Sequence, residues 1–210
     1  MKDLTHPNLA LYLPLWKRDG AAFRSNDAYG RLCTVTNAPA SEVDDVRGRV
    51  FDGTTSKITC ASDPIGILPI TIATTIKLTA WGGGNAGRIL DNGYLKVLAS
   101  ATNSCLNLYS DGVTKSESAV NSISLNKVYR AVFTRTAGGL VTSYINGLLS
   151  RADQNSGTPA PGNTLLCIGT NIDNSRTFAG FIQSVAVYTN VIWATPQVAY
   201  DYQEYKARRR

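Results

Sequence analysis

Apolar and polar residues alternate along much of this chain with the two-residue period of a β-strand. The clearest run extends from Ile70 to Trp81, where even-numbered positions are apolar except Thr74 and odd-numbered positions carry threonines and Lys77. This alternation predicts a strand that buries one face and leaves the other polar. Shorter runs with the same period extend from Leu9 to Trp16 and from Arg31 to Thr36.

Pairs of turn-forming residues separate these runs. Asn92-Gly93 and Asn146-Gly147 favour tight hairpins, because type I′ turns need positive φ at both central residues. Asp111-Gly112 and Gly138-Gly139 mark further turns. Turns this close together predict an antiparallel meander, and about a dozen short strands predict two sheets packed face to face. The fold class is therefore all-β, an antiparallel β-sandwich.

Only the C-terminal segment has a helical pattern. Thr195 is placed as an N-cap with Pro196 at the first helical position, and Val198, Tyr202 and Tyr205 share one face. We therefore expect a short C-terminal helix that packs Tyr202 against the sandwich.

The chain has no internal repeat, no low-complexity segment and no linker that would divide it. We therefore predict an N-terminal extension (1–8), a single sandwich domain (9–205) and a basic C-terminal tail (206–210). Four of the positive charges behind the formal net charge of +6 lie in that tail. We expect this tail to be solvated; the alternative is that it contacts phosphates or an acidic partner surface. The rest of the chain has no basic stripe that favours nucleic-acid binding.

The chain begins MKDLTHP, without the apolar core of a signal peptide, and its most apolar run is interrupted by Pro69 and Lys77. We therefore expect synthesis in the cytoplasm without a signal peptide and no insertion into a membrane. The four cysteines lie far apart in strand-like runs, so buried free thiols are expected rather than a zinc site. They are Cys33, Cys60, Cys105 and Cys167.

The sequence does not favour catalysis. Its three glutamates, Glu42, Glu117 and Glu204, form no E-x-D-x-E run of the kind that places an acid and a nucleophile on one strand. His6 precedes the first predicted strand, which argues against a Ser-His-Asp triad. The Gly82–Gly87 stretch lacks the Lys-Ser/Thr and the helix of a phosphate-binding loop. We therefore expect no enzyme activity.

Two polar loops are the candidate ligand-binding sites. Asparagine, aspartate and arginine bind sugar hydroxyls well, and the rims of sandwiches commonly carry such sites. The same residue types also form ordinary turns, and both interpretations remain open at this level. The candidates are Asn85, Arg88, Asp91 and Asn92 in the first loop and Asn171, Asp173, Asn174 and Arg176 in the second.

Several sequence blocks, taken in order, resemble the concanavalin A-like lectin/glucanase superfamily in its laminin-G-like branch. The blocks are LYLPLW, GRVFDGTTSKITC, TIKLTAW, SLNKVYRAVFTR followed by SYINGLLS, and FAGFIQSVAVYTNVI. The resemblance covers about Leu9 to Tyr205. It implies a jelly-roll sandwich of two curved sheets, a fold used for carbohydrate or protein adhesion.

In some members of that branch the resemblance also implies a structural calcium ion. Those members follow the F-D-G turn with further acids, whereas this chain has Thr-Thr-Ser at 54–56, and Gln183-Ser184 replaces carboxylates after the F-x-G-x-I strand. Calcium needs several oxygen ligands including carboxylates. We therefore expect no cofactor; Asp52 is the single candidate metal ligand, and a turn-forming role for it is preferred.

The stretches HPNLALYLPLW and YGRLCTVTNAPA resemble laminin-G-like proteins of phages and viruses. This resemblance implies a non-catalytic, lectin-like structural or adhesion protein, a decoration or appendage component on a virion surface. Such a protein would bind neighbouring assembly proteins and surface glycans and would form a homo-oligomer. The alternative is a stand-alone soluble carbohydrate-binding module that uses the two polar loops.

Overall fold

The computed structural model describes residues 6–16, 20–43, 46–111, 113–162 and 165–208. Nearly all regular structure in it is β-strand. The strands are β1 (Leu9–Leu13), β2 (Ala22–Arg24), β3 (Leu32–Thr36), β4 (Ala40–Val43), β5 (Val46–Asp52), β6 (Lys57–Cys60), β7 (Ile70–Ala80), β8 (Arg88–Asp91), β9 (Lys96–Ser100), β10 (Cys105–Tyr109), β11 (Lys115–Glu117), β12 (Val128–Arg135), β13 (Leu140–Ile145), β14 (Leu148–Asn155), β15 (Leu166–Ile168) and β16 (Ala179–Thr189). A 3₁₀ turn, η1 (Gly83–Asn85), and one helix, α1 (Thr195–Ala207), complete the elements.

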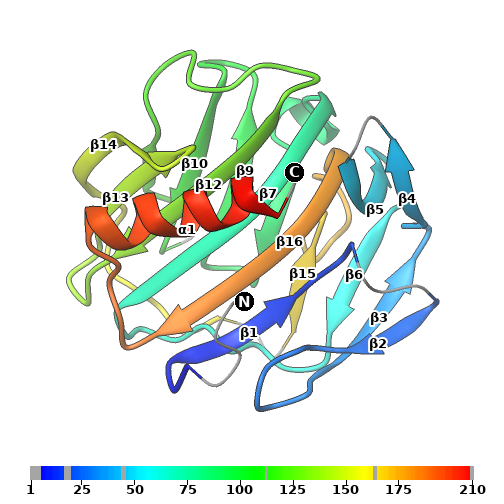
Figure 1. The fold of residues 1–210 in the computed structure, drawn as a ribbon, viewed down its shortest axis with the longest axis horizontal. Coiled ribbons are helices and arrows are strands. Elements are labelled where there is room, and N and C mark those ends of the chain that lie inside the picture. The colour runs from blue at the N-terminus through cyan, green and yellow to red at the C-terminus, as the bar shows by residue number, and fades with distance from the viewer. Residues whose placement is uncertain (1–5, 17–19, 44–45, 112, 163–164, 209–210) are drawn as a thin grey trace.

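The strands form two antiparallel sheets packed face to face (Figure 1). The first sheet has the order β14-β13-β12-β7-β16-β5-β4, and the second has the order β11-β10-β9-β8-β15-β6-β3-β2. The long strand β16 pairs along one edge with β7, and its other edge pairs with β5 over 179–182 and with β1 over 185–188. The predicted all-β sandwich and the β8–β11 meander are confirmed.

The main core lies between the sheets. It includes the even positions Ile70, Ile72, Ile76 and Leu78 of β7, as the alternation predicts, and an edge-to-face pair of Phe51 and Phe178 with ring centroids 6.2 Å apart. The Phe51 ring occupies space left by Gly169, where a Cβ atom would lie 2.0 Å from the ring. Core packing on this side therefore requires glycine at that position.

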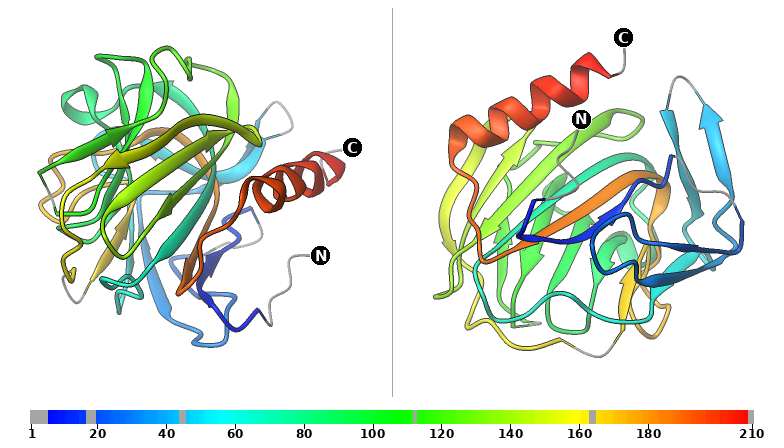
Figure 2. Two further views of the ribbon diagram at one scale, coloured as in Figure 1. Left: turned by 90° about the vertical axis from the view of Figure 1, so that its left-hand side faces the viewer. Right: turned by 60° about the horizontal axis from the view of Figure 1, so that its bottom comes forward.

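The prediction that β7 buries only one face is wrong. Thr71, Thr75 and Lys77, on its other face, are also buried. A second apolar cluster covers this outer face of the first sheet, and α1 lies over it through Val198 (Figure 2). Alternation predicts which residues point away from the main core, but it does not predict whether a helix far along the chain covers them.

The Asn146-Gly147 hairpin is confirmed. Ile145 pairs with Leu148 across it, and both turn residues have positive φ, 53° and 79°. The Asn146 side chain accepts a hydrogen bond from the backbone N–H of Arg130 at 3.0 Å, which ties the turn to β12. The Asn92-Gly93 hairpin is also present but contains four residues, because Asp91 pairs with Lys96.

Helix α1 differs from its prediction at its N-terminal end. Ala194, rather than Thr195, is the N-cap, and the Gln197 side chain accepts a hydrogen bond from the Ala194 N–H at 2.8 Å in place of a capping hydroxyl. The helix continues through Lys206 and Ala207, so the predicted tail begins as helix; residues 209–210 lie outside the described residues, as do residues 1–5 of the predicted extension. No helix within the described ranges is long and apolar enough to cross a membrane.

Candidate functional site

Two rows of side chains cross the outer face of the second sheet from β8 to β11. Strand register places Asp91, Lys96, Tyr109 and Lys115 opposite one another in the first row and Arg88, Leu98, Asn107 and Glu117 in the second. The alternate residues of these strands, such as Val97 and Leu108, belong to the main core, so the two rows point outward. We call these eight residues the polar face.

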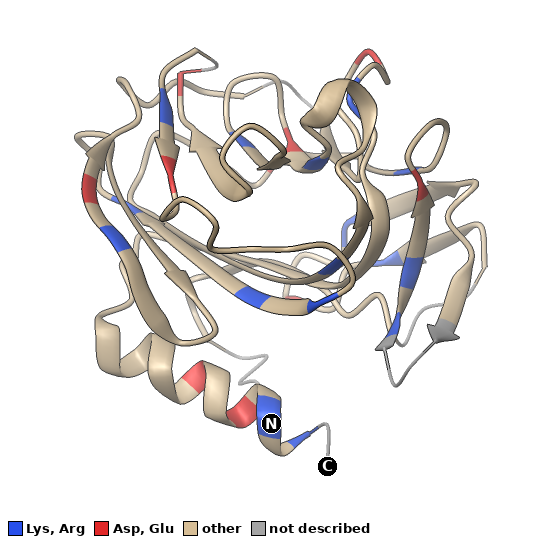
Figure 3. Cartoon of the chain, turned by 90° about the horizontal axis from the view of Figure 1, so that it is seen from above, with Lys and Arg blue, Asp and Glu red and all other residues tan. Residues whose placement is uncertain are grey.

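The shorter side chains of the polar face are buried, whereas its longer side chains are partly accessible to solvent. Leu98 and Asn107 in the second row are each 2% exposed, whereas Lys96, Tyr109 and Lys115 in the first row keep part of their surface open. A ligand on this face would therefore meet ammonium groups and a phenol first. The face belongs to the second sheet, whereas α1, the helix at the edge of the molecule in Figure 3, lies over the outer apolar cluster of the first sheet.

Arg88 and Asp91 form an ion pair at one end of the polar face. Arg88 Nε lies 3.2 Å from Asp91 Oδ2, and Asp91 Oδ1 accepts the Gly93 N–H at 2.7 Å. Burial raises the pKa of Asp91, against the opposing effects of the Gly93 hydrogen bond and Arg88, and burial also lowers the pKa of Arg88. Each charge therefore depends on the other, and Asp91 fixes the position of the guanidinium.

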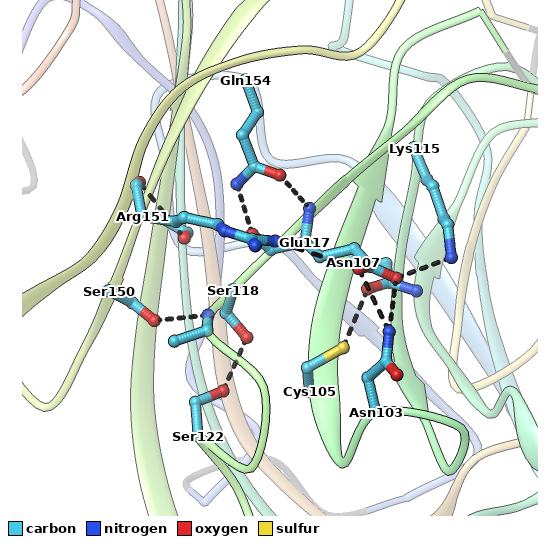
Figure 4. A network of polar contacts seen from close by, with 12 residues as sticks. Asn103, Cys105, Asn107, Lys115, Glu117, Ser118, Ser122, Ser150, Arg151 and Gln154 are labelled. Carbon is cyan, nitrogen blue, oxygen red and sulfur yellow. Dashed lines mark hydrogen bonds and ion pairs between the residues drawn. The ribbon is translucent and has the colours of Figure 1, made fainter.

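Glu117 is the centre of a polar network at the other end of the face (Figure 4). Its carboxylate accepts hydrogen bonds from Asn103 Nδ2 at 3.2 Å and from Lys115 Nζ at 2.6 Å, and Arg151 Nη1 lies 3.9 Å away. The hydrogen bond to Glu117 raises the pKa of Lys115. Glu117 thus positions two cations beside the sheet.

Side chains also join the edge strands β11 and β14, and this seam holds Arg151 beside the polar face. The Gln154 carboxamide accepts the Glu117 N–H at 3.0 Å and donates to the Glu117 carbonyl, imitating a strand partner. Ser150 Oγ accepts the Ala119 N–H at 2.9 Å. Because these bonds satisfy backbone groups at a sheet edge, they close the sandwich on this side.

The two predicted loops lie side by side at the β8 end of the polar face. The Gly83 N–H donates to the Thr177 carbonyl at 2.8 Å, and the Arg88 N–H donates to the Arg176 carbonyl at 3.0 Å. Arg176 Nη1 donates to the Gly84 carbonyl at 2.9 Å. The structure therefore brings together two groups of candidate residues that lie far apart in the sequence.

Several of these candidates have structural partners. Asn92 is buried, donates to Asp63 and accepts the Leu95 N–H; Asn171 accepts the Arg176 N–H. Asp173 accepts hydrogen bonds from both the hydroxyl and the N–H of Ser175, and these bonds lower the pKa of Asp173.

The remaining loop candidates also have structural roles. Asn174 accepts a hydrogen bond from Lys57 Nζ, and Asn85 has a positive φ within η1. Of the eight candidates, Arg88 and Asp91 also belong to the polar face.

Sequence reasoning missed the other six residues of the polar face. Lys96, Asn107 and Tyr109 occupy the outward positions of the stretches YLKVLAS and CLNLYS, which were identified as strands. Listing the outward positions of each predicted strand would have found them. A search for loops rich in Asn and Asp could not find them, because the missed residues of the polar face lie within strands.

Asp52, the candidate metal ligand, holds its own turn. Its carboxylate accepts the N–H groups of Thr54, Thr55 and Ser56 and the hydroxyl of Thr55. Burial opposes ionisation, but these hydrogen bonds prevail and hold the pKa of Asp52 well below its usual range. Among the described residues, no group of three or more His, Cys, Asp or Glu side chains is placed to hold a metal ion.

All four cysteines are buried free thiols, as predicted. Cys33 and Cys60 face the main core, whereas Cys105 and Cys167 alternate with core residues and lie on the outer side of the same sheet. Cys105 donates to Asn107 Oδ1 at 3.2 Å, and burial raises the pKa of Cys105 to about 11. The outer thiols are therefore weak nucleophiles near neutral pH.

Two antiparallel sheets, one with an outward polar face, define a lectin-like β-sandwich. A family model described as the concanavalin A-like lectin/glucanases superfamily matches residues 52–195, and the chain belongs to this superfamily. No curated protein sequence matches the chain.

Solved structures share the fold at low sequence identity. Domain 4 of AbnA, a GH43 extracellular arabinanase from Geobacillus stearothermophilus solved with arabinotriose, superposes with a TM-score of 0.69 at 15% identity, covering 93% of this chain and 98% of the domain. Trypanosoma rangeli sialidase in complex with sialic acid gives 0.70 at 15% identity over 97% of this chain. This chain spans only 34% of the sialidase.

Proposed function

We propose that this chain is a non-catalytic carbohydrate-binding domain that binds glycans on the polar face. The observation that supports this most is the pair of aligned rows, which place Lys96, Tyr109 and Lys115 on the same outer face of the sheet as Arg88. The similar fold of domain 4 of AbnA, which was solved with arabinotriose, agrees with a sugar ligand. Four consecutive strands give the face a length that suits an extended chain rather than a single small molecule.

The chemistry of the face suits sugars. Ammonium and guanidinium groups donate hydrogen bonds to hydroxyl and carboxylate oxygens, and the Glu117 carboxylate accepts from hydroxyls. The ring of Tyr109 offers an apolar surface with a polar edge, which matches the mixed character of a pyranose. Because Asp91 and Glu117 hold neighbouring cations in place, little side-chain entropy remains to be lost on binding.

The positions of the two acids support binding without hydrolysis. Asp91 lies on β8 and Glu117 on β11, three strand spacings apart in the sheet order. Three spacings correspond to about 14 Å between backbones, whereas the paired carboxyl groups of glycosidases lie roughly 5 to 9.5 Å apart. The Asp91 side chain, at 2% exposure, is also held against Arg88 rather than offered to a ligand.

A glycan array followed by calorimetry tests this proposal. We expect specific binding that falls at least tenfold in Tyr109→Ala and Lys96→Ala, while Lys127→Ala, an exposed lysine outside the polar face, binds like the wild type. Thermal unfolding of each variant shows whether the fold is intact. Release of reducing sugar from a bound glycan, or unchanged binding in both face variants, would contradict the proposal.

The array is repeated with calcium and with a chelator. Because the Asp52 carboxylate is occupied by its own turn, we expect the same binding in both conditions. Binding that disappears with the chelator would show that a metal ion takes part and that Asp52 has a second role.

We also propose that the domain works as a decoration or appendage component on a virion surface, after synthesis in the cytoplasm, and binds neighbouring assembly proteins. The N-terminal resemblance supports this role, and so do Leu148 and Leu149, which are 74% and 54% exposed at the start of β14 and offer an apolar surface to a neighbouring protein. Mass spectrometry of particles purified from the source culture tests it. Peptides of this chain should copurify with the particles, and their absence would contradict the role.

A further inference from the structure

Cys33 and Cys60 face each other directly across two strands of the second sheet. They are register partners on β3 and β6, both are fully buried, and their Sγ atoms lie 2.6 Å apart. This separation is closer to a sulfur–sulfur bond, about 2.05 Å, than to an ordinary packing contact. The two side chains already point at one another, so little movement separates the free thiols from a bonded pair.

The strand geometry permits a bond at this position. The Ala61 N–H donates to the Leu32 carbonyl at 2.9 Å, so positions 32 and 61 form a hydrogen-bonded pair. Cys33 and Cys60 therefore occupy the adjacent non-hydrogen-bonded pair, in which Cα atoms are about 4.5 Å apart. Disulfides span Cα distances of roughly 4.4 to 6.8 Å, so this pair lies within their range.

We propose that Cys33 and Cys60 form a cross-strand disulfide that links β3 to β6 when the chain folds in the presence of an oxidised thiol such as glutathione disulfide. One cysteine thiolate attacks glutathione disulfide and releases one glutathione thiolate, which takes up the proton. The second cysteine thiolate attacks the resulting mixed disulfide and releases the other glutathione. Two protein thiols are oxidised, and one glutathione disulfide is reduced to two glutathione molecules.

The buried position of the pair determines when the bond forms. The hydrogen bond with Cys33, together with burial, raises the pKa of the Cys60 thiol well above its ordinary value. Few thiolates therefore exist once the core is closed. β3 has only the three-residue strand β2 between it and the sheet edge. The exchange therefore takes place during folding, or during opening of this edge.

The other two cysteines provide an internal control. Cys105 pairs with Ser100, and Cys167 pairs with Thr59 and Asp91, so neither has a cysteine as its cross-strand partner. β8 and β9 separate their strands in the sheet. All four thiols are buried, but only one pair has the geometry of a disulfide.

Oxidative refolding tests the proposal. The denatured, reduced chain is refolded in a glutathione redox buffer, alkylated under denaturing conditions, and mapped by peptide mass spectrometry. We expect alkylation at Cys105 and Cys167 only, and a linked peptide that joins Cys33 to Cys60. The double variant C105S/C167S should keep the link, and Cys33→Ala should lose it. Alkylation of all four thiols in the wild type, or a link to Cys105 or Cys167, overturns the proposal without relying on any variant to fold.

Thermal unfolding tests whether the native fold accommodates the bond. A cross-link that closes a loop of this length should raise Tm by about 5 °C or more over the reduced protein. Reduction followed by a second scan should restore the lower value. A linked protein with a lower Tm would mean that the bond forms only in a non-native chain, which overturns the assignment.

Discussion

The two outer faces of the sandwich use the same pairing of arginine with aspartate in opposite ways. On the first sheet, Arg130 is 3% exposed and binds Asp201 of α1 through Nε at 2.7 Å and Nη2 at 3.0 Å. Burial opposes its charge, but attraction to Asp201 prevails and raises the pKa of Arg130. On the second sheet, Arg88 makes one longer contact with Asp91, and burial lowers its pKa.

This difference indicates that the face beneath α1 contributes to stability, whereas the polar face is the one proposed to bind a ligand. The Arg130 guanidinium also donates to Thr75 Oγ1 at 3.1 Å, so its nitrogens are occupied by the protein and serve to hold α1 over the outer apolar cluster. Among the described residues no helix covers the polar face, and its long side chains stay partly open. We therefore expect substitutions beneath α1 to change the free energy of unfolding and substitutions on the polar face to change ligand affinity.

The largest expected effect is that of Asp201→Ala. It leaves the Arg130 charge buried without its bidentate partner, and the loss of one member of a buried pair costs about 3–5 kcal/mol. Urea unfolding measures this loss. Glu204→Ala on the same helix removes exposed contacts, among them those with Arg208 and Tyr200, and should change stability little. Equal stability of the two variants would contradict a structural role for the buried pair.

Gly147→Ala should have the next largest effect. Gly147 has a φ of +79°, and a Cβ atom there would lie 2.8 Å from the Cβ of Tyr202 on α1. Positive φ at a residue other than glycine costs about 1–3 kcal/mol, and the clash would displace α1. Gly138→Ala is the matched control, because its Cβ would approach no atom closer than 3.9 Å. Denaturant midpoints of the two variants test the difference.

The Asp63 carboxyl group, on the side of the second sheet, predicts that the stability of the folded protein depends on pH. Burial raises its pKa from 3.8 to about 6, although hydrogen bonds from Ile65 and Asn92 oppose the shift. The folded state therefore takes up a proton first as pH falls, and the contribution of Asp63 to stability increases from pH 7 towards pH 4. Above pH 6 the buried carboxylate is charged and reduces stability by roughly 1 kcal/mol, after allowance for its partial exposure.

Asp63→Asn isolates this effect. The carboxamide imitates the protonated acid, so the variant should be more stable than the wild type at pH 7 and similar to it near pH 4. Unfolding curves at the two pH values give the comparison. A variant that is less stable at both values would show that the carboxylate is needed in its charged form.

The sequence predicted which segments form strands better than it predicted which elements lie next to one another. Alternation identified β7 and its core positions, because a strand buries every second residue wherever it lies. It could not predict that β16, more than a hundred residues later, would pair along the whole of β7, nor that α1 would cover the other face. Those contacts depend on long-range packing, which leaves no local pattern.

The candidate site was predictable in part for a related reason. Composition identified the loops around Arg88 and Arg176, but it could not distinguish an available asparagine from one held by a residue elsewhere in the chain, as Asn92 is by Asp63. The polar face needed strand register, which places Lys96 between Asp91 and Tyr109. Each of its residues is unremarkable alone, and the rows form only when four strands align.

Lys115→Ala should change stability least and still reduce binding. Its ion pair with Glu117 joins a side chain that is 49% exposed to one that is 15% exposed, and such surface pairs contribute less than about 1 kcal/mol. If the polar face binds glycans, loss of this ammonium removes a charge-assisted hydrogen bond and lowers affinity about tenfold or more. Asp201→Ala, refolded at low temperature, should show the reverse, with low stability and normal affinity. If instead both variants lost affinity in proportion to their stability, the two faces would not be separate, and the binding role would belong to the fold as a whole.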